Sequence, residues 1–124
     1  MHAFDYNYIS SKEIIVRNAK AGEKITTLDG NVHELTPEML CIADGEKPVA
    51  LAGIMGGENS EILDTTNTVV FESANFARMN IRLTSRQANL RTESSAKFEK
   101  GLPPVNTVPG RKSCQRPERS FYSI

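Results

Sequence analysis

The sequence has few of the residues that build disulfide frameworks, metal sites or membrane spans. Among its 124 residues are two cysteines, Cys41 and Cys114, and no tryptophan. The cysteines belong to no CxxC or Cys/His pattern, so they predict reduced thiols instead of a zinc site, and neither is a good catalytic candidate. No run of about 18 apolar residues is present, so we expect no membrane-spanning helix and no membrane partner.

The start of the chain also lacks the pattern of a secretory signal, which is a basic stretch followed by an apolar one. His2, Asp5 and other polar residues stand there instead. Together with the two lone cysteines, this predicts a cytoplasmic protein. A chain of 124 residues has room for one domain with a packed core that needs no disulfide or structural metal.

The net charge is zero, but the charges are unevenly distributed along the chain. Residues 1–76 hold 5 basic and 12 acidic side chains, whereas residues 77–124 hold 10 basic and 3 acidic ones. A basic segment can lie along a phosphate backbone and release its condensed counterions. A solvated helix face followed by a charged tail explains the same composition, so charge alone does not establish a nucleic-acid partner.

Runs of β-branched residues bounded by turn signals predict several short strands. In chain order from the first, the expected strands are 14–16, 24–28, 32–35, 41–43, 49–52 and 68–72. Two Asp-Gly pairs, at 29–30 and 44–45, have the chemistry of tight turns and predict two hairpins. Residues 37–40, which follow a capping threonine and begin with proline, predict one helical turn.

Apolar residues at helical spacing predict a longer helix from 77 to about 90. Its expected apolar side contains Met79, Ile81, Leu83, Ala88 and Leu90. Three arginines, at positions 78, 82 and 86, line another side. A shorter helix is expected over 94–100, and Gly101 ends it because glycine can adopt the left-handed cap conformation.

Residues 103–124 are expected to form a divergent, disordered tail. Prolines at positions 103, 104, 109 and 117 break any helix, and residues 110–120 show no apolar period. The chain is therefore expected to divide into an ordered part, residues 1–102, and this tail.

Glycine is concentrated in the segment Gly53-Ile54-Met55-Gly56-Gly57. The spacing matches neither a dinucleotide-binding GxGxxG motif nor a phosphate loop ending in Gly-Lys-Ser/Thr, so it does not predict a nucleotide site. Two interpretations remain open, namely backbone that turns sharply and backbone that a ligand approaches closely.

Two titratable residues stand out. Glu72 ends an apolar strand, so its carboxylate either faces solvent at a sheet edge or has a partner, because burying it alone is costly. His2 is a lone histidine, and such residues are more often surface or core groups than catalysts. No serine or cysteine nucleophile motif accompanies it, so the sequence does not support a hydrolase triad.

The segment Arg91-Thr92-Glu93-Ser94-Ser95 precedes the shorter predicted helix. Thr92 or Ser94 can cap that helix, which alone explains the hydroxyl groups. Because the N–H groups at a helix start point outward, the same segment can also hold a carboxylate or phosphate group.

Four segments occur in the order in which one family carries them. Taken together they resemble the beta subunit of bacterial phenylalanyl-tRNA synthetase, within its editing domain. The resemblance covers about residues 1–102, and the glycine-rich segment is its most specific part. The segments are Met1-His2-Ala3-Phe4-Asp5, Leu28-Asp29-Gly30, residues 50–61, and Arg91-Thr92-Glu93-Ser94-Ser95 running to Phe98-Glu99-Lys100-Gly101.

The resemblance implies an α+β fold with a β-sandwich-like mixed sheet core and one long and one short C-terminal helix. The fold is expected to be truncated relative to the family domain, because Met1 coincides with the interior of that domain. The family's enzymes contain two alpha and two beta subunits and use ATP and magnesium on the alpha subunit. The resemblance therefore implies no cofactor in this chain, and it implies three partners: the alpha subunit, a second beta subunit and the 3′ aminoacyl end of phenylalanine tRNA.

The family's editing domain hydrolyses tyrosine that is wrongly esterified to phenylalanine tRNA. Glu72 matches a residue that accepts a hydrogen bond from the tyrosine hydroxyl, a group that phenylalanine lacks. His2 matches a histidine near the ester and is the candidate for catalysis. The other matched positions are Ala52 and Gly53 at the backbone edge of the pocket, and Thr92 and Ser94 beside the aminoacyl group and the terminal adenosine.

Similar proteins carry alanine at the position of Ser94, so its hydroxyl either narrows the pocket or adds a polar contact. The resemblance supplies no general base, and a bound water oriented by the backbone and by the tRNA hydroxyls is expected to attack the ester. The rival hypothesis is a non-catalytic RNA-binding or scaffold fragment of the synthetase. The editing hypothesis requires four dispersed residues to converge: His2, Gly53, Glu72 and Thr92.

Overall fold

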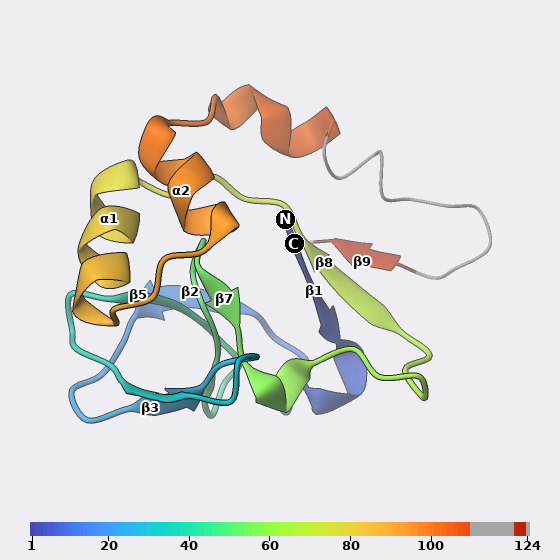
Figure 1. The fold of residues 1–124 in the computed structure, drawn as a ribbon. Coiled ribbons are helices and arrows are strands. Elements are labelled where there is room, and N and C mark those ends of the chain that lie inside the picture. The colour runs from blue at the N-terminus through green and yellow to red at the C-terminus, as the bar shows by residue number, and fades with distance from the viewer. Residues whose placement is uncertain (110–120, 124) are drawn as a thin grey trace.

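The structure is a computed structural model of the chain and describes residues 1–109 and 121–123. Its strands are β1 (His2–Asp5), β2 (Ile15–Asn18), β3 (Lys24–Thr26), β4 (Val32–Glu34), β5 (Leu40–Ala43), β6 (Pro48–Leu51), β7 (Met55–Gly56), β8 (Val69–Glu72) and β9 (Phe121–Ser123). Its helices are α1 (Arg78–Gln87) and α2 (Glu93–Lys100), with short 3₁₀ turns η1 (Tyr6–Tyr8), η2 (Glu58–Ser60) and η3 (Pro104–Asn106). These elements confirm the α+β fold (Figure 1).

The described strands form three sheets. In the first, β8 lies between β1, which is antiparallel to it, and β9, which is parallel to it. The second is the antiparallel sheet β2-β5-β6-β7, and the third is the β3-β4 hairpin. Helices α1 and α2 pack side by side (Figure 1). Neither these nor any other helix in the described ranges combines the length and the apolar character that crossing a bilayer requires.

Strand β1 precedes the segment that was predicted as the first strand, so that prediction is wrong. β1 pairs with β8, which is distant in sequence, and a long-range partner leaves no local signal. Both hairpins are confirmed, as β3-β4 and β5-β6. The predicted helical turn over 37–40 is instead a turn closed by a 2.9 Å hydrogen bond from Met39 N–H to the Thr36 carbonyl, and Leu40 already belongs to β5.

Helix α1 confirms the longer predicted helix, but its buried side differs from the predicted one. Met79 is 64% exposed and Leu83 is 43% exposed. Ile81 is buried as predicted, and Thr84 and Ser85 are buried in place of Met79 and Leu83. The Ser85 hydroxyl donates to a backbone carbonyl at 2.8 Å, so this polar group is satisfied inside the fold. Apolar spacing on the helix does not show which of two sides meets the core, because that depends on the neighbouring elements.

One hydrophobic core joins the sheets to both helices. Its members come from every sheet of the described residues and include Phe4, Ile25, Ile42, Leu51, Val70, Ile81 and Phe98. The first sheet and α2 therefore share a buried interior, and residues that project into it from either side can meet.

The predicted disorder of residues 103–124 falls partly on 110–120 and 124, which lie outside the described residues. Within the described part, η3 follows shortly after α2, and the Ser73 hydroxyl donates to the Thr107 carbonyl at 2.7 Å. Strand β9 pairs with β8. These contacts attach the described residues of the tail to the sheet that carries Glu72.

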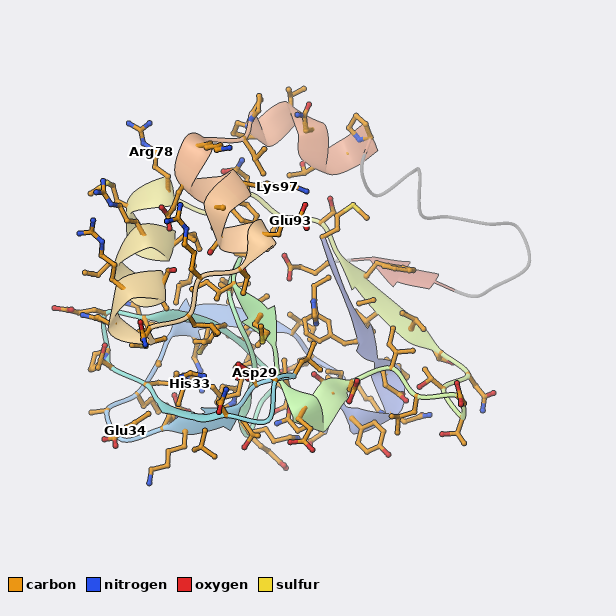
Figure 2. The ribbon with its side chains drawn as sticks, in the orientation of Figure 1. Asp29, His33, Glu34, Arg78, Glu93 and Lys97 are labelled. Atoms are coloured by element: carbon orange, nitrogen blue, oxygen red, sulfur yellow. The ribbon has the colours of Figure 1, made fainter. Side chains whose placement is uncertain are left out.

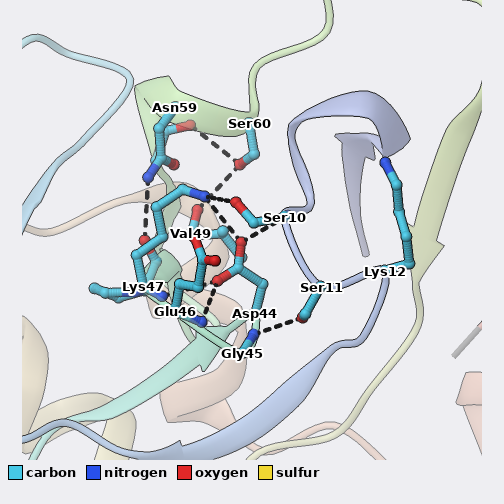
Figure 3. A network of polar contacts seen from close by, with 12 residues as sticks. Ser10, Ser11, Lys12, Asp44, Gly45, Glu46, Lys47, Val49, Asn59 and Ser60 are labelled. Carbon is cyan, nitrogen blue, oxygen red and sulfur yellow. Dashed lines mark hydrogen bonds and ion pairs between the residues drawn. The ribbon is translucent and has the colours of Figure 1, made fainter.

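A buried carboxylate connects the turn between β5 and β6 to the loop before β2 (Figure 3). Asp44 Oδ1 accepts from the N–H groups of Glu46 and Lys47, both at 2.8 Å. Its Oδ2 accepts from Ser10 N–H at 3.0 Å and from Lys47 Nζ at 2.9 Å. Burial opposes ionisation of Asp44, but the hydrogen bonds from Lys47 and its neighbours outweigh burial and hold the carboxyl pKa well below its usual range. The charged form therefore stabilises the fold.

Replacing Asp44 with asparagine is expected to reduce the free energy of unfolding by about 1–3 kcal/mol at pH 7, because charge-assisted hydrogen bonds are lost. A carboxyl whose pKa is lowered in the folded state stabilises the protein at pH values above its unfolded pKa. That stabilisation is lost as the pH falls toward the folded pKa. The difference between the two proteins should shrink below about pH 4. Urea unfolding at pH 7 and at acidic pH checks this, with exposed Glu46→Gln as the control that should change little. A difference that stays constant with pH would contradict the account.

Candidate functional site

Strands β1 and β8 place a histidine and a carboxylate opposite each other. In their antiparallel register His2 faces Glu72, and Phe4 faces Val70. Opposed residues project to the same side of a sheet, and Phe4 and Val70 are buried in the core. His2 and Glu72 therefore point toward the interior that this sheet shares with α2.

A hollow of about 80 Å³ lies between this sheet, the glycine-rich segment and α2. It brings together His2, Gly53, Glu72 and Ser94, which are four of the six residues singled out from the sequence. The rest of its lining includes apolar side chains such as Ile54 and Phe98, as well as backbone of the glycine-rich segment. A small hollow with an apolar wall and two titratable groups can hold one side chain that has a polar tip.

Glu72 is buried, with 8% of its surface exposed, so the interpretation that it faces solvent at a sheet edge is wrong. Burial raises the pKa of its carboxyl, and the positive amino terminus nearby partly opposes this. Within the described residues no hydrogen bond to its carboxylate is found, while the hollow lies in front of it. Among the described residues the buried polar side-chain atom without a partner is His33 Nε2 and not a Glu72 oxygen. The Glu72 carboxylate instead lines the hollow, where it can accept a hydrogen bond from a ligand.

His2 is held against the glycine-rich segment. Burial lowers the pKa of its imidazole, and the nearby amino terminus lowers it further, so the ring is neutral at neutral pH. Its ring meets the Phe4 ring edge-on, with centroids 4.6 Å apart. A Cβ at position 56 would lie 2.3 Å from His2 Nε2, so the ring occupies the space that Gly56 leaves open. A neutral imidazole in this position can accept a proton.

Gly53 forms the sharp turn between β6 and β7. Its φ of +70° lies in the left-handed region that favours glycine. A Cβ there would lie 2.8 Å from Ile81 Cδ1 and 3.1 Å from the Phe76 and Phe98 rings. The interpretation of a sharp turn is confirmed at Gly53. The close neighbour at Gly56 is the protein's own His2 ring, so approach of a ligand to this segment stays a prediction.

The start of α2 is bonded to this turn. Thr92 is the N-cap, since its Oγ1 accepts from Ser95 N–H at 3.1 Å, and Ser95 Oγ accepts from Thr92 N–H at 2.9 Å. The same Thr92 hydroxyl donates to the Ile54 carbonyl at 2.9 Å. The Ser94 hydroxyl donates to the Gly53 carbonyl at 3.0 Å. Of the two candidate caps, Thr92 and Ser94, the residue that caps α2 is Thr92. Both residues also bind the backbone of the glycine-rich segment.

Two of the predicted residues do not line the hollow. Ala52 is buried directly before the turn, and its N–H donates to the Leu40 carbonyl at 3.1 Å. Thr92 reaches the hollow only through Ile54, whose carbonyl it binds. The predicted ligand contacts of these two residues therefore stay predictions, while their hydrogen bonds hold the backbone on either side of Gly53.

Gly56 and Phe98 were not singled out from the sequence as functional. Gly56 belonged to a glycine cluster whose purpose was left open, and Phe98 is a core residue of α2 that also lines the hollow. A cluster of three glycines indicates that another group packs closely against the backbone. Only the tertiary structure shows that the group beside Gly56 is the His2 imidazole.

The part of the chain that the structure describes contains no cluster of side chains suited to bind a metal ion. No group of three or more His, Cys, Asp or Glu side chains there is arranged to hold a metal ion. Cys41 is buried in the core, and burial raises the pKa of its thiol, which disfavours the reactive thiolate. The titratable side chains at the hollow are those of His2 and Glu72, and Met1 lies beside them.

Comparison with known proteins shows what this chain is similar to. The chain is 59% identical over 102 residues to the phenylalanine–tRNA ligase beta subunit of Carboxydothermus hydrogenoformans, and 53% identical over 107 residues to that of Geobacillus kaustophilus. These matches cover 82% and 86% of this chain but only 13% of each relative's length, and they confirm the resemblance to this beta subunit. The sequence profile described as the B3/4 domain matches residues 1–116. The chain belongs to the B3/4 domain family.

Proposed function

We propose that this chain is the part of a phenylalanine–tRNA ligase beta subunit that hydrolyses tyrosine from wrongly charged phenylalanine tRNA. The observation that carries the proposal is the buried carboxylate of Glu72, without a hydrogen-bond donor among the described residues, opposite a neutral His2 in one small hollow. Relatives that share 51–59% of the aligned residues are named as this subunit, which supports the assignment.

The carboxylate accounts for selection between tyrosine and phenylalanine. A tyrosine hydroxyl would donate to Glu72 and satisfy it, whereas phenylalanine would bury the charge without a partner. Sites built around a substrate hydroxyl reject the analogue that lacks it by roughly 10⁴–10⁵. The volume of about 80 Å³ suits one amino-acid side chain, with the rest of the RNA outside.

The hydrolysis needs one proton acceptor near the ester. Water forms a bond to the ester carbonyl carbon, the bond to the ribose oxygen breaks, and that oxygen takes up a proton, which yields tyrosine and free tRNA. Neutral His2 can accept the proton of the water and return it to the ribose oxygen. Ser94 donates its hydroxyl hydrogen to Gly53, which leaves its oxygen lone pairs for a substrate group.

The proposal includes the assembly in which the site works. The chain would act in the cytoplasm within a synthetase of two alpha and two beta subunits. Charging of the tRNA with ATP and magnesium would take place on the alpha subunit. The editing step as written uses neither ATP nor a metal ion, because water, a proton acceptor and the ester suffice.

Replacing Glu72 with alanine is expected to slow tyrosine release about tenfold to a hundredfold, which corresponds to the 1.5–3 kcal/mol of a hydrogen bond to a charged group. The test places residues 1–102 in the matching 102-residue segment of the Carboxydothermus hydrogenoformans beta subunit, assembled with its alpha subunit. Release of tyrosine from mischarged tRNA is then measured for both proteins. Equal rates would show that the assignment of Glu72 is wrong.

A second measurement separates loss of function from loss of fold. Because burial raises the pKa of Glu72, the folded state disfavours its charge, and stability is lost as pH rises above the unfolded pKa. Glu72→Gln should therefore be more stable than the parent at pH 7, and this advantage should disappear below about pH 4. Slower editing in a more stable protein would exclude unfolding as the cause.

The rival candidate is an RNA-binding or scaffold role without catalysis. It is favoured by the excess of basic residues over 77–124. In that case the Glu72 variants would release tyrosine at the parent rate, and binding of tRNA would show the steep salt dependence typical of phosphate contacts.

A further inference from the structure

We propose that Arg82, Arg86 and Arg91 form a binding site for RNA phosphate groups at the C-terminal end of α1. In identifying that RNA as tRNA, the inference rests on the proposed function. A second hollow, of about 420 Å³, is lined by the three arginines together with Ser85, Asn89 and Glu99. Guanidinium groups bind phosphate oxygens through two parallel hydrogen bonds, so three of them around one concave surface suit a phosphodiester backbone.

The backbone after α1 holds these arginines in place. Asn89 adopts a φ of +50°, Leu90 N–H donates to the Ser85 carbonyl at 2.9 Å, and Asn89 N–H donates to the Arg86 carbonyl at 3.1 Å. This is the hydrogen-bond pattern of a helix that ends in a left-handed residue. The Ser85 hydroxyl adds a bond to the Leu90 carbonyl at 2.8 Å. The chain therefore turns back and brings Arg91 beside the last turn of α1.

The local sequence does nothing to neutralise this charge. From Arg78 to Thr92 no acidic residue occurs, and Arg78, Arg82 and Arg86 follow one another at a spacing of four, which places like charges beside each other on a helix. Among the described residues, the ion pairs join other partners, as in the exposed pair of Lys97 and Glu93 at 2.9 Å (Figure 2).

The lining of the arginine hollow is positively charged overall. Glu99 is the one acid in the lining, so an excess of positive charge remains.

The arginine hollow lies beside the proposed editing hollow, across α2. Ser94 and Phe98 of α2 line the first hollow, and Glu99 of the same helix lines the second. An RNA strand whose 3′ end enters the first hollow would reach the arginines by crossing α2. The exposed side chains of Met79 and Leu83 do not line the arginine hollow. Its lining therefore suits phosphate groups better than the apolar surface of a protein partner.

The test measures binding of deacylated phenylalanine tRNA to the 124-residue chain between 50 and 200 mM salt. The variant Arg82→Gln/Arg86→Gln/Arg91→Gln should reduce the slope of log K against log salt by roughly two to three, since each phosphate contact contributes about 0.7–0.9. The matched control Lys20→Gln/Lys24→Gln/Arg78→Gln removes the same charge from exposed positions outside the hollow. It should leave the slope close to that of the parent.

Equal slopes for the variant and the parent, equal losses in the variant and the control, or no binding of tRNA by the parent would each overturn the inference. So would normal tRNA binding combined with weaker association with the alpha subunit, which would identify a protein contact. If the triple variant unfolds in thermal melts, the three single variants replace it, and each should lower the slope by about 0.7–0.9. Glu72→Ala should keep the parent slope, so failure of the editing assignment and failure of this site are distinguishable.

Discussion

Replacing Gly56 with alanine is expected to slow tyrosine release by about a hundredfold while changing the free energy of unfolding little. The added Cβ would lie 2.3 Å from His2 Nε2 and 2.4 Å from Cε1, so the imidazole has to leave its present position. The contacted atoms are the far end of the His2 side chain, so the ring can move without displacing backbone. A displacement of about 1 Å in a reacting group can cost about 10²-fold in rate.

A double-mutant cycle tests whether the loss passes through His2. His2→Ala alone should slow release about as much as Gly56→Ala, and the double variant should be no slower than either, because two changes to one interaction are not additive. The measurement is single-turnover release of tyrosine from mischarged tRNA by the same assembled enzyme. Additive losses would show that Gly56 acts on something other than the histidine.

Replacing Gly53 with alanine is expected to give a large loss of stability, about 2–5 kcal/mol. A left-handed conformation costs a residue with a Cβ about 1–2 kcal/mol, and overpacking a filled core costs about 1–3 kcal/mol more. Here the Cβ would press on the side chains of Ile81, Phe76 and Phe98 at 2.8–3.1 Å. Because Phe98 also lines the editing hollow, the change should impair tyrosine release as well.

Gly22 is the matched control for Gly53. Its φ of +81° is similar, but a Cβ there meets no atom within 4 Å. Gly22→Ala should therefore show the backbone strain alone, about 1–2 kcal/mol, and normal editing. Urea unfolding of both variants gives the difference between them, which measures the overpacking. Equal losses would mean that the contacts around Gly53 relax without cost.

Local chemistry predicted those parts of the fold whose determinants lie close together in sequence. The turns at Asp29-Gly30 and Asp44-Gly45 predicted both hairpins, and Thr92 before α2 predicted a cap, because each signal acts over a few residues. Strand β1 was missed, and the buried side of α1 was wrong at Met79 and Leu83. Both depend on partners from distant parts of the chain, so no local pattern carries them.

The resemblance pointed to the candidate site before its geometry was known. Of the six residues that it proposed, His2, Gly53, Glu72 and Ser94 line one hollow, whereas Ala52 and Thr92 do not. The sequence could not predict three features of the site, because each depends on which atoms surround the group. These are the burial of Glu72, the neutral state of His2 and the space that Gly56 provides.

The sequence by itself determined the family and the residue types available for chemistry: the carboxylate of Glu72 at a strand end, the imidazole of His2 and a cluster of glycines. Only the tertiary structure decided that β1 pairs with β8 in the register that sets His2 against Glu72, and that Gly56 leaves room for the ring. The physical reason is the period of a strand. A shift of one residue would turn His2 to the opposite face, and long-range pairing together with core packing selects between the two registers.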